Sequence, residues 1–80
     1  MARLRLFGPA REAAGVAVAT IGGGTVSEVL EAAGKRFGAD FADIAATARI
    51  WVDGEPVGVE AVVGEDDEVA VLPPVSGGSA

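Results

Sequence analysis

The segment from Thr25 to Gly38 constrains the fold most, because it carries both ends and one buried face of a helix. Thr25 and Glu28 have the spacing of a capping box, in which a threonine caps the helix and a glutamate three residues later bonds back. Gly38 predicts the C-terminal end of the helix. Between these signals, apolar residues recur at helical spacing and predict one buried stripe, made of Val26, Val29, Leu30, Ala33 and Phe37.

Two stretches with the pattern of strands precede this helix. Residues Arg3 to Phe7 alternate charged and apolar side chains, the period-two pattern of a half-buried strand. Leu4 and Leu6 therefore point to one face, while Phe7 and the two arginines point to the other. Residues Val16 to Ile21 are rich in β-branched side chains and predict a second strand. The connection between them is short and contains Gly-Pro, so we expect an antiparallel hairpin with a turn, or one short helical turn, inside it.

The C-terminal half contains a second hairpin signal and a final strand. Asp53-Gly54 lies between two short apolar runs, a strong local signal for a hairpin. Pro56 cannot donate a ladder hydrogen bond, so the second arm should be short or lie at an edge. Residues Glu68 to Leu72 predict the last strand, which Pro73 ends. Residues 39–48 show no clear pattern, and we expect an irregular or short helical connection there.

The predicted order is strand, strand, helix, strand, short strand, strand. With 50% hydrophobic residues, the chain of 80 residues has enough apolar side chains for one small core. The order predicts an α+β domain in which a mixed sheet packs against one main helix. We expect this domain to cover residues 1–74, and residues 75–80 to form a flexible C-terminal Gly-Gly tail.

The chain lacks the side chains that most active sites use. It contains no histidine and no cysteine, so the usual general base, nucleophile and thiolate ligand are missing. Four consecutive acidic residues, 65–68, fit a solvated turn better than a calcium loop, whose ligands alternate. Three glycines, 22–24, precede the predicted helix, but the lysine of a phosphate-binding loop is absent, which favours a plain turn. We expect no activity from the chain alone, no metal site and no cofactor bound by the chain itself.

Charge and hydropathy exclude two classes of partner. Twelve acidic residues against six basic ones give a net charge of −6, so the chain offers no basic stripe for nucleic acid. No apolar run approaches the roughly 20 residues of a membrane helix. The N-terminus lacks the pattern of a signal peptide, so we expect a cytoplasmic protein. An acidic surface suits a basic partner, although acidity also serves solubility.

The C-terminal residues form an unusual sequence after the last strand. Pro73 and Pro74 favour an extended segment that leads away from the sheet. Residues 75–78 then add a reach of about 13 Å. Gly77 and Gly78 have no Cβ and fit a channel that is too narrow for side chains. The alternative interpretation is a disordered terminus, since glycine and serine are frequent in frayed ends.

Four segments carry a family resemblance that covers nearly the whole chain: RLRLFGPAREAAG, GGTVSEVLEAA, VDGEPV and GEDDEVAVLPPVSGG. The chain resembles the ubiquitin-like β-grasp sulfur carriers, and most closely the MoaD type, the small subunit of molybdopterin synthase. The closing DEVAVLPPVSGG is the specific part of the match. The resemblance implies a β-grasp fold and a carrier that bears a C-terminal thiocarboxylate.

The resemblance also implies the chemistry and the partners of the tail. An adenylating enzyme of the MoeB kind, related to ubiquitin-activating enzymes, uses ATP to adenylate the carboxylate of Gly78, which is then exchanged for a thiocarboxylate. Gly77 lets the backbone thread into the enzyme. Together with a MoaE-type large subunit, the carrier donates this sulfur to a cyclic pyranopterin precursor of molybdopterin.

The family presents an apolar patch to its partners, next to the start of the tail. Phe7, Val57 and Leu72 match that patch, and burial in the core is an equal alternative for each of them. With the start of the tail, the residues expected to bind partners are Phe7, Val57, Leu72, Pro73, Pro74 and Val75.

Ser79 and Ala80 depart from the family pattern, in which the Gly-Gly pair is the end. Either a peptidase trims them, or they are a cloning remnant, or carrier activity is lost. Within the class, a thiazole carrier of the ThiS kind and a cysteine-synthesis carrier are the alternatives. From a different class, the alternative is a β-grasp interaction module without sulfur chemistry, for which the tail is irrelevant.

Overall fold

The computed structural model describes residues 1–74, in which strands and helices alternate along the chain. The elements are β1 (Ala2–Leu6), α1 (Gly8–Ala14), β2 (Val18–Ile21), α2 (Val26–Phe37), α3 (Ala39–Thr47), β3 (Arg49–Val52), β4 (Glu55–Pro56) and β5 (Glu68–Leu72). The predicted tail, residues 75–80, lies outside the described residues.

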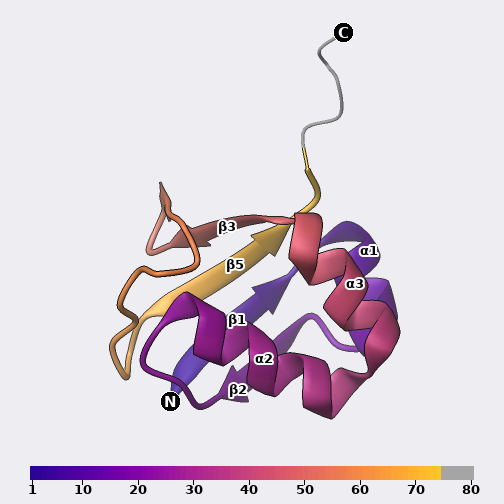
Figure 1. The fold of residues 1–80 in the computed structure, drawn as a ribbon, viewed down its shortest axis with the longest axis horizontal. Coiled ribbons are helices and arrows are strands. Elements are labelled where there is room, and N and C mark those ends of the chain that lie inside the picture. Colours follow the sequence, from indigo (N-terminus) through magenta and orange to yellow (C-terminus); the bar gives the residue numbers. More distant parts are fainter. Residues whose placement is uncertain (75–80) are drawn as a thin grey trace, which may run out of the picture.

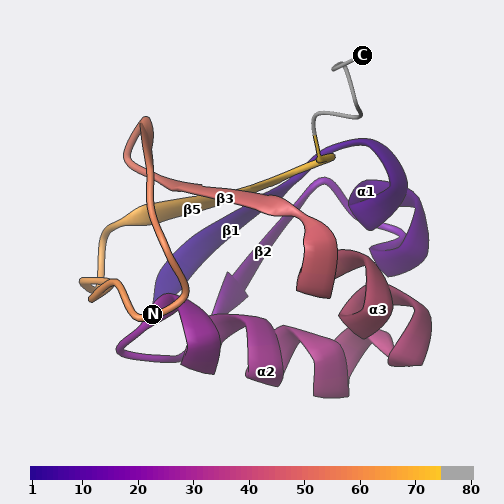
Figure 2. The same cartoon turned by 45° about the horizontal axis from the view of Figure 1, so that its top comes forward.

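The strands form one mixed sheet in the order β2-β1-β5-β3-β4. β1 and β5, the first and last strands in the chain, pair in parallel at the centre, and the other neighbouring pairs are antiparallel. Helices α2 and α3 lie on one face of this sheet, and α1 lies at the end where β1 finishes (Figures 1 and 2). The predicted mixed sheet, α+β class and β-grasp fold are confirmed.

The core lies between the sheet and the helices. The alternation in β1 is as predicted, because Leu4 and Leu6 are buried while the arginines between them are exposed. Of the predicted helical stripe, Val26, Val29 and Ala33 are buried, and Leu30 and Phe37 are half-buried against the core. Fully burying a valine, leucine or phenylalanine side chain stabilises the fold by about 1.5–3 kcal/mol.

The predicted N-cap of α2 is confirmed, but the glutamate bonds back to Gly24 rather than to the N-cap residue itself. The Thr25 hydroxyl accepts a hydrogen bond from the Glu28 N–H at 3.2 Å, and the Glu28 carboxylate accepts one from the Gly24 N–H at 2.7 Å. A Cβ at Gly23 would lie 2.8 Å from the Val29 backbone nitrogen, so the glycine run lets the chain pass close to the helix. At the other end, the Gly38 N–H donates to the Gly34 carbonyl at 2.8 Å. Residues 22–24 therefore form a close connection from β2 to α2, with a bend at Gly24.

Two helices exceed the expectation of one main helix. Residues 8–14 form a seven-residue helix rather than a single turn, because Pro9 fits its first turn and Gly15 caps it with φ of 79°. Residues 39–47 form nine-residue α3, which Gly38 separates from α2. α2 and α3 pack closely at Gly34, where a Cβ would lie 3.3 Å from the Ala42 Cβ.

The second hairpin follows the sequence prediction. Asp53 and Gly54 both have positive φ, 51° and 86°, as a two-residue hairpin turn of type I′ requires. β4 has only two residues, ends at Pro56 and lies at the edge of the sheet. The acidic turn before β5 is held by the Asp67 carboxylate, which accepts a hydrogen bond from the Gly64 N–H at 2.8 Å.

Candidate functional site

We call the face of the sheet that points away from α2 and α3 the outer face. It carries a shallow apolar groove. No helix of the described residues crosses this face (Figure 2). The groove has a volume of about 300 Å³. It is lined by Arg5, Phe7, Trp51, Gly54, Glu68, Ala70 and Leu72.

Alternation along β1, β3 and β5 places the side chains that these strands contribute to the groove. Phe7 follows buried Leu6 and is 39% exposed, which confirms the predicted assignment of the two faces of β1. In β3, Ile50 is buried and Trp51 is 37% exposed. The sheet register then aligns Trp51 with Ala70, and Ala70 with Arg5, in one row across the three central strands.

Arginines flank the apolar residues of the groove. Arg5 forms an ion pair with Glu68, with 3.2 Å between Nη1 and Oε2. Both side chains are well exposed, so this pair contributes at most about 1 kcal/mol to stability. Arg49 lies directly opposite Leu72 in the antiparallel β3–β5 pair. Neighbours in such a pair have Cβ atoms about 5 Å apart, so Arg49 borders the groove at its tail end.

The start of the tail is fixed against the corner between β1 and α1. The Phe7 N–H donates to the Val71 carbonyl at 3.2 Å, the last rung before the tail. Pro73 then lies against Gly8, where a Cβ would come within 3.3 Å of the proline Cγ. Gly8 has φ of 57°, a left-handed conformation that disfavours side chains. The direction in which the chain leaves β5 is therefore set by contacts within the domain.

The structure brings part of the predicted partner-binding set together. Phe7 and Leu72 line the groove, and exposed Pro73 and Pro74 follow directly. Val57 does not line the groove; it is half-buried against the core and lines a neighbouring hollow of about 260 Å³, which shares Trp51 with the groove and also includes Arg49. Val75, Gly77 and Gly78 lie outside the described residues.

Sequence reasoning missed Trp51 and Ala70. The signal for Trp51 was the alternation in residues 49–52, which points Trp51 away from the core once Ile50 is assigned inward. For Ala70 the corresponding signal was the alternation in β5, where Val69 and Val71 are buried. Both residues join the site only through pairing of β3 with β5, which are far apart in the sequence.

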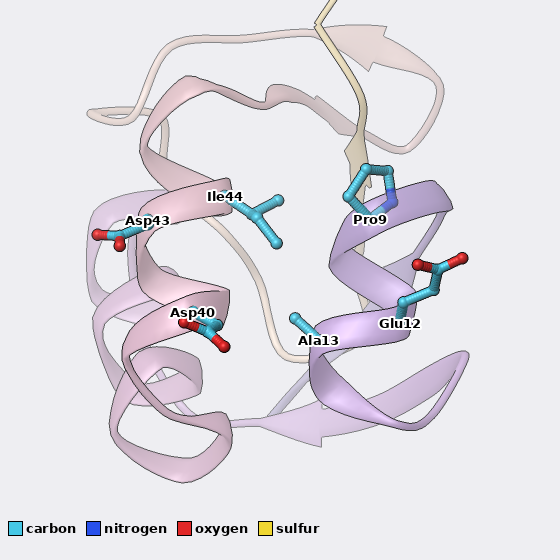
Figure 3. A pocket seen from close by; sticks show the side chains of 6 residues that line it. All are labelled: Pro9, Glu12, Ala13, Asp40, Asp43 and Ile44. Atoms are coloured by element: carbon cyan, nitrogen blue, oxygen red, sulfur yellow. The ribbon is translucent and has the colours of Figure 1, made fainter.

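A second hollow, of about 470 Å³, lies between α1 and α3 (Figure 3). Glu12, Asp40 and Asp43 line it together with Pro9, Ala13 and Ile44. Its carboxylates face solvent, and the lining contains no hydroxyl, thiol or amine side chain and no side chain that donates hydrogen bonds at neutral pH. Among residues 1–74, no group of three or more acidic residues is placed to hold a metal ion. This hollow therefore has the character of a solvated acidic surface.

The described part of the chain contains no helix that is long and apolar enough to cross a membrane.

Comparison with known proteins agrees with the fold. The ThiS family matches residues 4–78. A search of curated proteins finds no match.

Solved structures provide similar folds. Small archaeal modifier protein 1 from Methanosarcina acetivorans is 27% identical, with a TM-score of 0.83 over 95% of this chain and 94% of that chain. The molybdopterin converting factor subunit 1 described from Pyrococcus furiosus is 27% identical, with a TM-score of 0.81 over 92% and 97% of the two chains. A BexX/CysO complex from Amycolatopsis orientalis gives 23% identity and a TM-score of 0.81, covering 96% and 99%, and this likeness shows the fold alone.

The family match spans β1 to the second glycine of the tail, and the structural likenesses cover nearly the whole length of both chains. The chain belongs to the ThiS family, a family of ubiquitin-like sulfur carriers.

Proposed function

We propose that this chain carries sulfur as a thiocarboxylate on Gly78 and donates it to a cyclic pyranopterin precursor in molybdopterin biosynthesis. The observation that carries the proposal is the geometry of β5. This central strand runs along the groove of the outer face and ends at Leu72, from which the chain continues to the two glycines. A partner that covers the groove is therefore close to the start of the reactive tail.

The tail is long enough to carry its end away from the domain and into a partner. Pro73 to Gly78 is five residue steps, which span at most about 17 Å when extended. Glycines at the tip allow a close approach of the backbone to the partner's nucleotide site. In this proposal the chain supplies the carboxylate and the partner supplies the catalytic side chains. This agrees with a sequence that contains neither histidine nor cysteine.

The chemistry proceeds in two steps, adenylation and sulfur transfer. A carboxylate oxygen of Gly78 attacks the α-phosphorus of ATP, pyrophosphate leaves, and an acyl-adenylate forms. This mixed anhydride makes AMP a good leaving group, whereas a free carboxylate resists nucleophiles. Hydrosulfide, or an equivalent sulfur donor, then attacks the carbonyl carbon, the bond to AMP breaks, and a thiocarboxylate remains. A MoeB-type enzyme performs the first step, and a MoaE-type subunit uses the product.

The choice of pathway is supported by two observations. The closing DEVAVLPPVSGG resembles the MoaD type, and the Pyrococcus furiosus protein described as a molybdopterin converting factor subunit is 27% identical. A role as a protein modifier is the second candidate, since small archaeal modifier protein 1 is equally similar. A thiazole carrier, a cysteine-synthesis carrier and an interaction module without sulfur chemistry are the further alternatives.

The proposal is tested with a chain that ends at Gly78. Incubation with a MoeB-type enzyme, ATP and sodium sulfide should raise its intact mass by the difference between sulfur and oxygen. Addition of a MoaE-type subunit and the cyclic precursor should then return the carrier to its carboxylate form and yield the dithiolene product. A carrier that gains sulfur but does not bind the MoaE-type subunit would contradict the molybdopterin role while leaving the carrier role intact. A carrier that never gains sulfur would contradict both.

A further inference from the structure

We propose that the outer face recognises the surface of an adenylating enzyme on which carboxylates flank an apolar side chain. This inference rests on the proposed function and names the partner chemistry of the same site. It is opposite to the expectation from net charge, which suggests a basic partner for an acidic protein.

Half of the basic residues of the chain lie on the outer face. The net charge is −6, with six basic residues in all. Three of these, Arg3, Arg5 and Arg49, occupy exposed positions on the outer side of β1 and β3. Within the described strands β1, β2, β3 and β5, Glu68 is the acidic residue on that side. Its carboxylate is engaged by Arg5, and Glu65 and Asp66 line a hollow together with Arg3, so among these three arginines Arg49 is the one without an acidic neighbour in the described contacts.

Arg49 is the cation that a partner must accommodate. Its side chain is exposed and has no ion pair or hydrogen bond within residues 1–74, so water solvates it in the free protein. It lies opposite Leu72, beside the point at which the tail begins. A partner that covers Trp51 and Leu72 would also remove water from Arg49, and an arginine buried without an acceptor is costly. A carboxylate on the partner best replaces the hydrogen bonds that Arg49 loses with this water, because it accepts two parallel hydrogen bonds from a guanidinium.

The same features argue against two other occupants. A second copy of this chain, bound through the same face by two-fold symmetry, would offer Arg49 only a face whose acidic residue in the central strands, Glu68, is already paired with Arg5. A nucleic acid would meet an overall charge of −6 and a groove whose floor is apolar. An apolar anchor next to Trp51, with carboxylates around it, satisfies both the groove and its cations.

The test compares two charge reversals in a chain that ends at Gly78. Arg49→Glu changes the charge on the outer face, and Arg11→Glu makes the same net change on exposed α1. The affinity for a MoeB-type enzyme from the same organism is measured by calorimetry at low and at physiological salt. Arg49→Glu should weaken binding roughly tenfold or more at low salt and flatten its salt dependence, whereas Arg11→Glu should change it less than about twofold. Arg49→Lys should retain most of the affinity.

Kinetics separate docking from chemistry. If Arg49 acts in docking, Arg49→Glu raises the KM for the carrier in pyrophosphate exchange and leaves kcat unchanged at saturation. Equal effects of the two charge reversals, or a fall in kcat with an unchanged KM, would overturn the inference. Two results with the unsubstituted chain would also overturn it: failure to bind the enzyme, or self-association of the carrier through this face in sedimentation. Binding without adenylation would overturn the proposed function and leave the docking chemistry standing. Adenylation at the same rate with and without Arg49 would overturn the docking inference and leave the proposed function standing.

Discussion

Substitution of Gly8 by alanine should separate the stability of the domain from the placement of its tail. Gly8 and Gly15 lie at the two ends of α1, and both have positive φ, 57° and 79°. Alanine in this conformation costs roughly 1–2 kcal/mol at either position. For a domain of this size that lowers the melting temperature by about 4–8 °C per kcal/mol. The two variants should therefore lose similar stability.

The two positions differ in what the new methyl group meets. At Gly15 nothing lies within 4 Å, whereas at Gly8 the Cβ would lie 3.3 Å from the Pro73 Cγ. An ordinary carbon–carbon contact is about 3.5–4.0 Å, so Pro73 must shift by a few tenths of an ångström. Since a misplacement of about 1 Å can cost a hundredfold in rate, this smaller shift should lower kcat/KM for adenylation roughly two- to tenfold.

The assay is pyrophosphate exchange with chains that end at Gly78, alongside thermal melting of each variant. A double substitution, Gly8→Ala with Pro73→Ala, removes the ring carbon that the methyl group meets. Gly8→Ala should therefore lower the activity less in the Pro73→Ala background than in the unsubstituted chain, and this difference is the coupling that a double-mutant cycle measures. Equal activity of Gly8→Ala and Gly15→Ala would refute the argument that this contact positions the tail.

Two further predictions concern the faces of β1 and the isolated chain. Phe7→Ala should weaken binding to the MoaE-type subunit by about 1–3 kcal/mol with little change in melting temperature, because Phe7 is 39% exposed. Leu6→Ala, one residue earlier at 2% exposure, should instead cost about 2–5 kcal/mol of stability, and a large loss of stability in Phe7→Ala would contradict the assignment. The purified chain alone should neither turn over nor bind ATP, and stoichiometric, tight binding in calorimetry would count against the carrier role.

The elements that were predicted from sequence are those with local signals. Thr25 and Glu28 act within one turn of α2, and Asp53-Gly54 acts within one hairpin, so each signal is complete over a few residues. α3 was underestimated because its alanine-rich sequence has a weak apolar period. Its position depends on packing, including the Phe37 and Phe41 rings at 5.3 Å between centroids.

The candidate site shows the same limit. Phe7 was assigned correctly from its own strand, because alternation needs only the neighbouring leucines. Trp51 and Ala70 were missed, since the groove exists only when β5 inserts between β1 and β3. The strand order is set by the burial of the whole sheet rather than by any short segment. The position of Arg49 beside Leu72 depends on that order as well, whereas composition alone suggested a basic partner.

The last prediction concerns Ser79 and Ala80, which place Gly78 in a peptide bond. Adenylation needs a free α-carboxylate at the position that a Gly-Gly tip reaches. The 80-residue chain offers instead the carboxylate of Ala80, two residues or about 7 Å further on, with a methyl group beside it. We therefore expect the chain that ends at Gly78 to exchange pyrophosphate and gain a thiocarboxylate, and the 80-residue chain to do neither until a peptidase removes the two residues. Gly78→Val in the shorter chain should abolish the reaction without unfolding the domain, because a β-branched side chain adds bulk where only backbone fits. Mass spectrometry after incubation with enzyme, ATP and sulfide decides the matter, and equal sulfur gain by the untrimmed chain would show that the two residues do not block the tip.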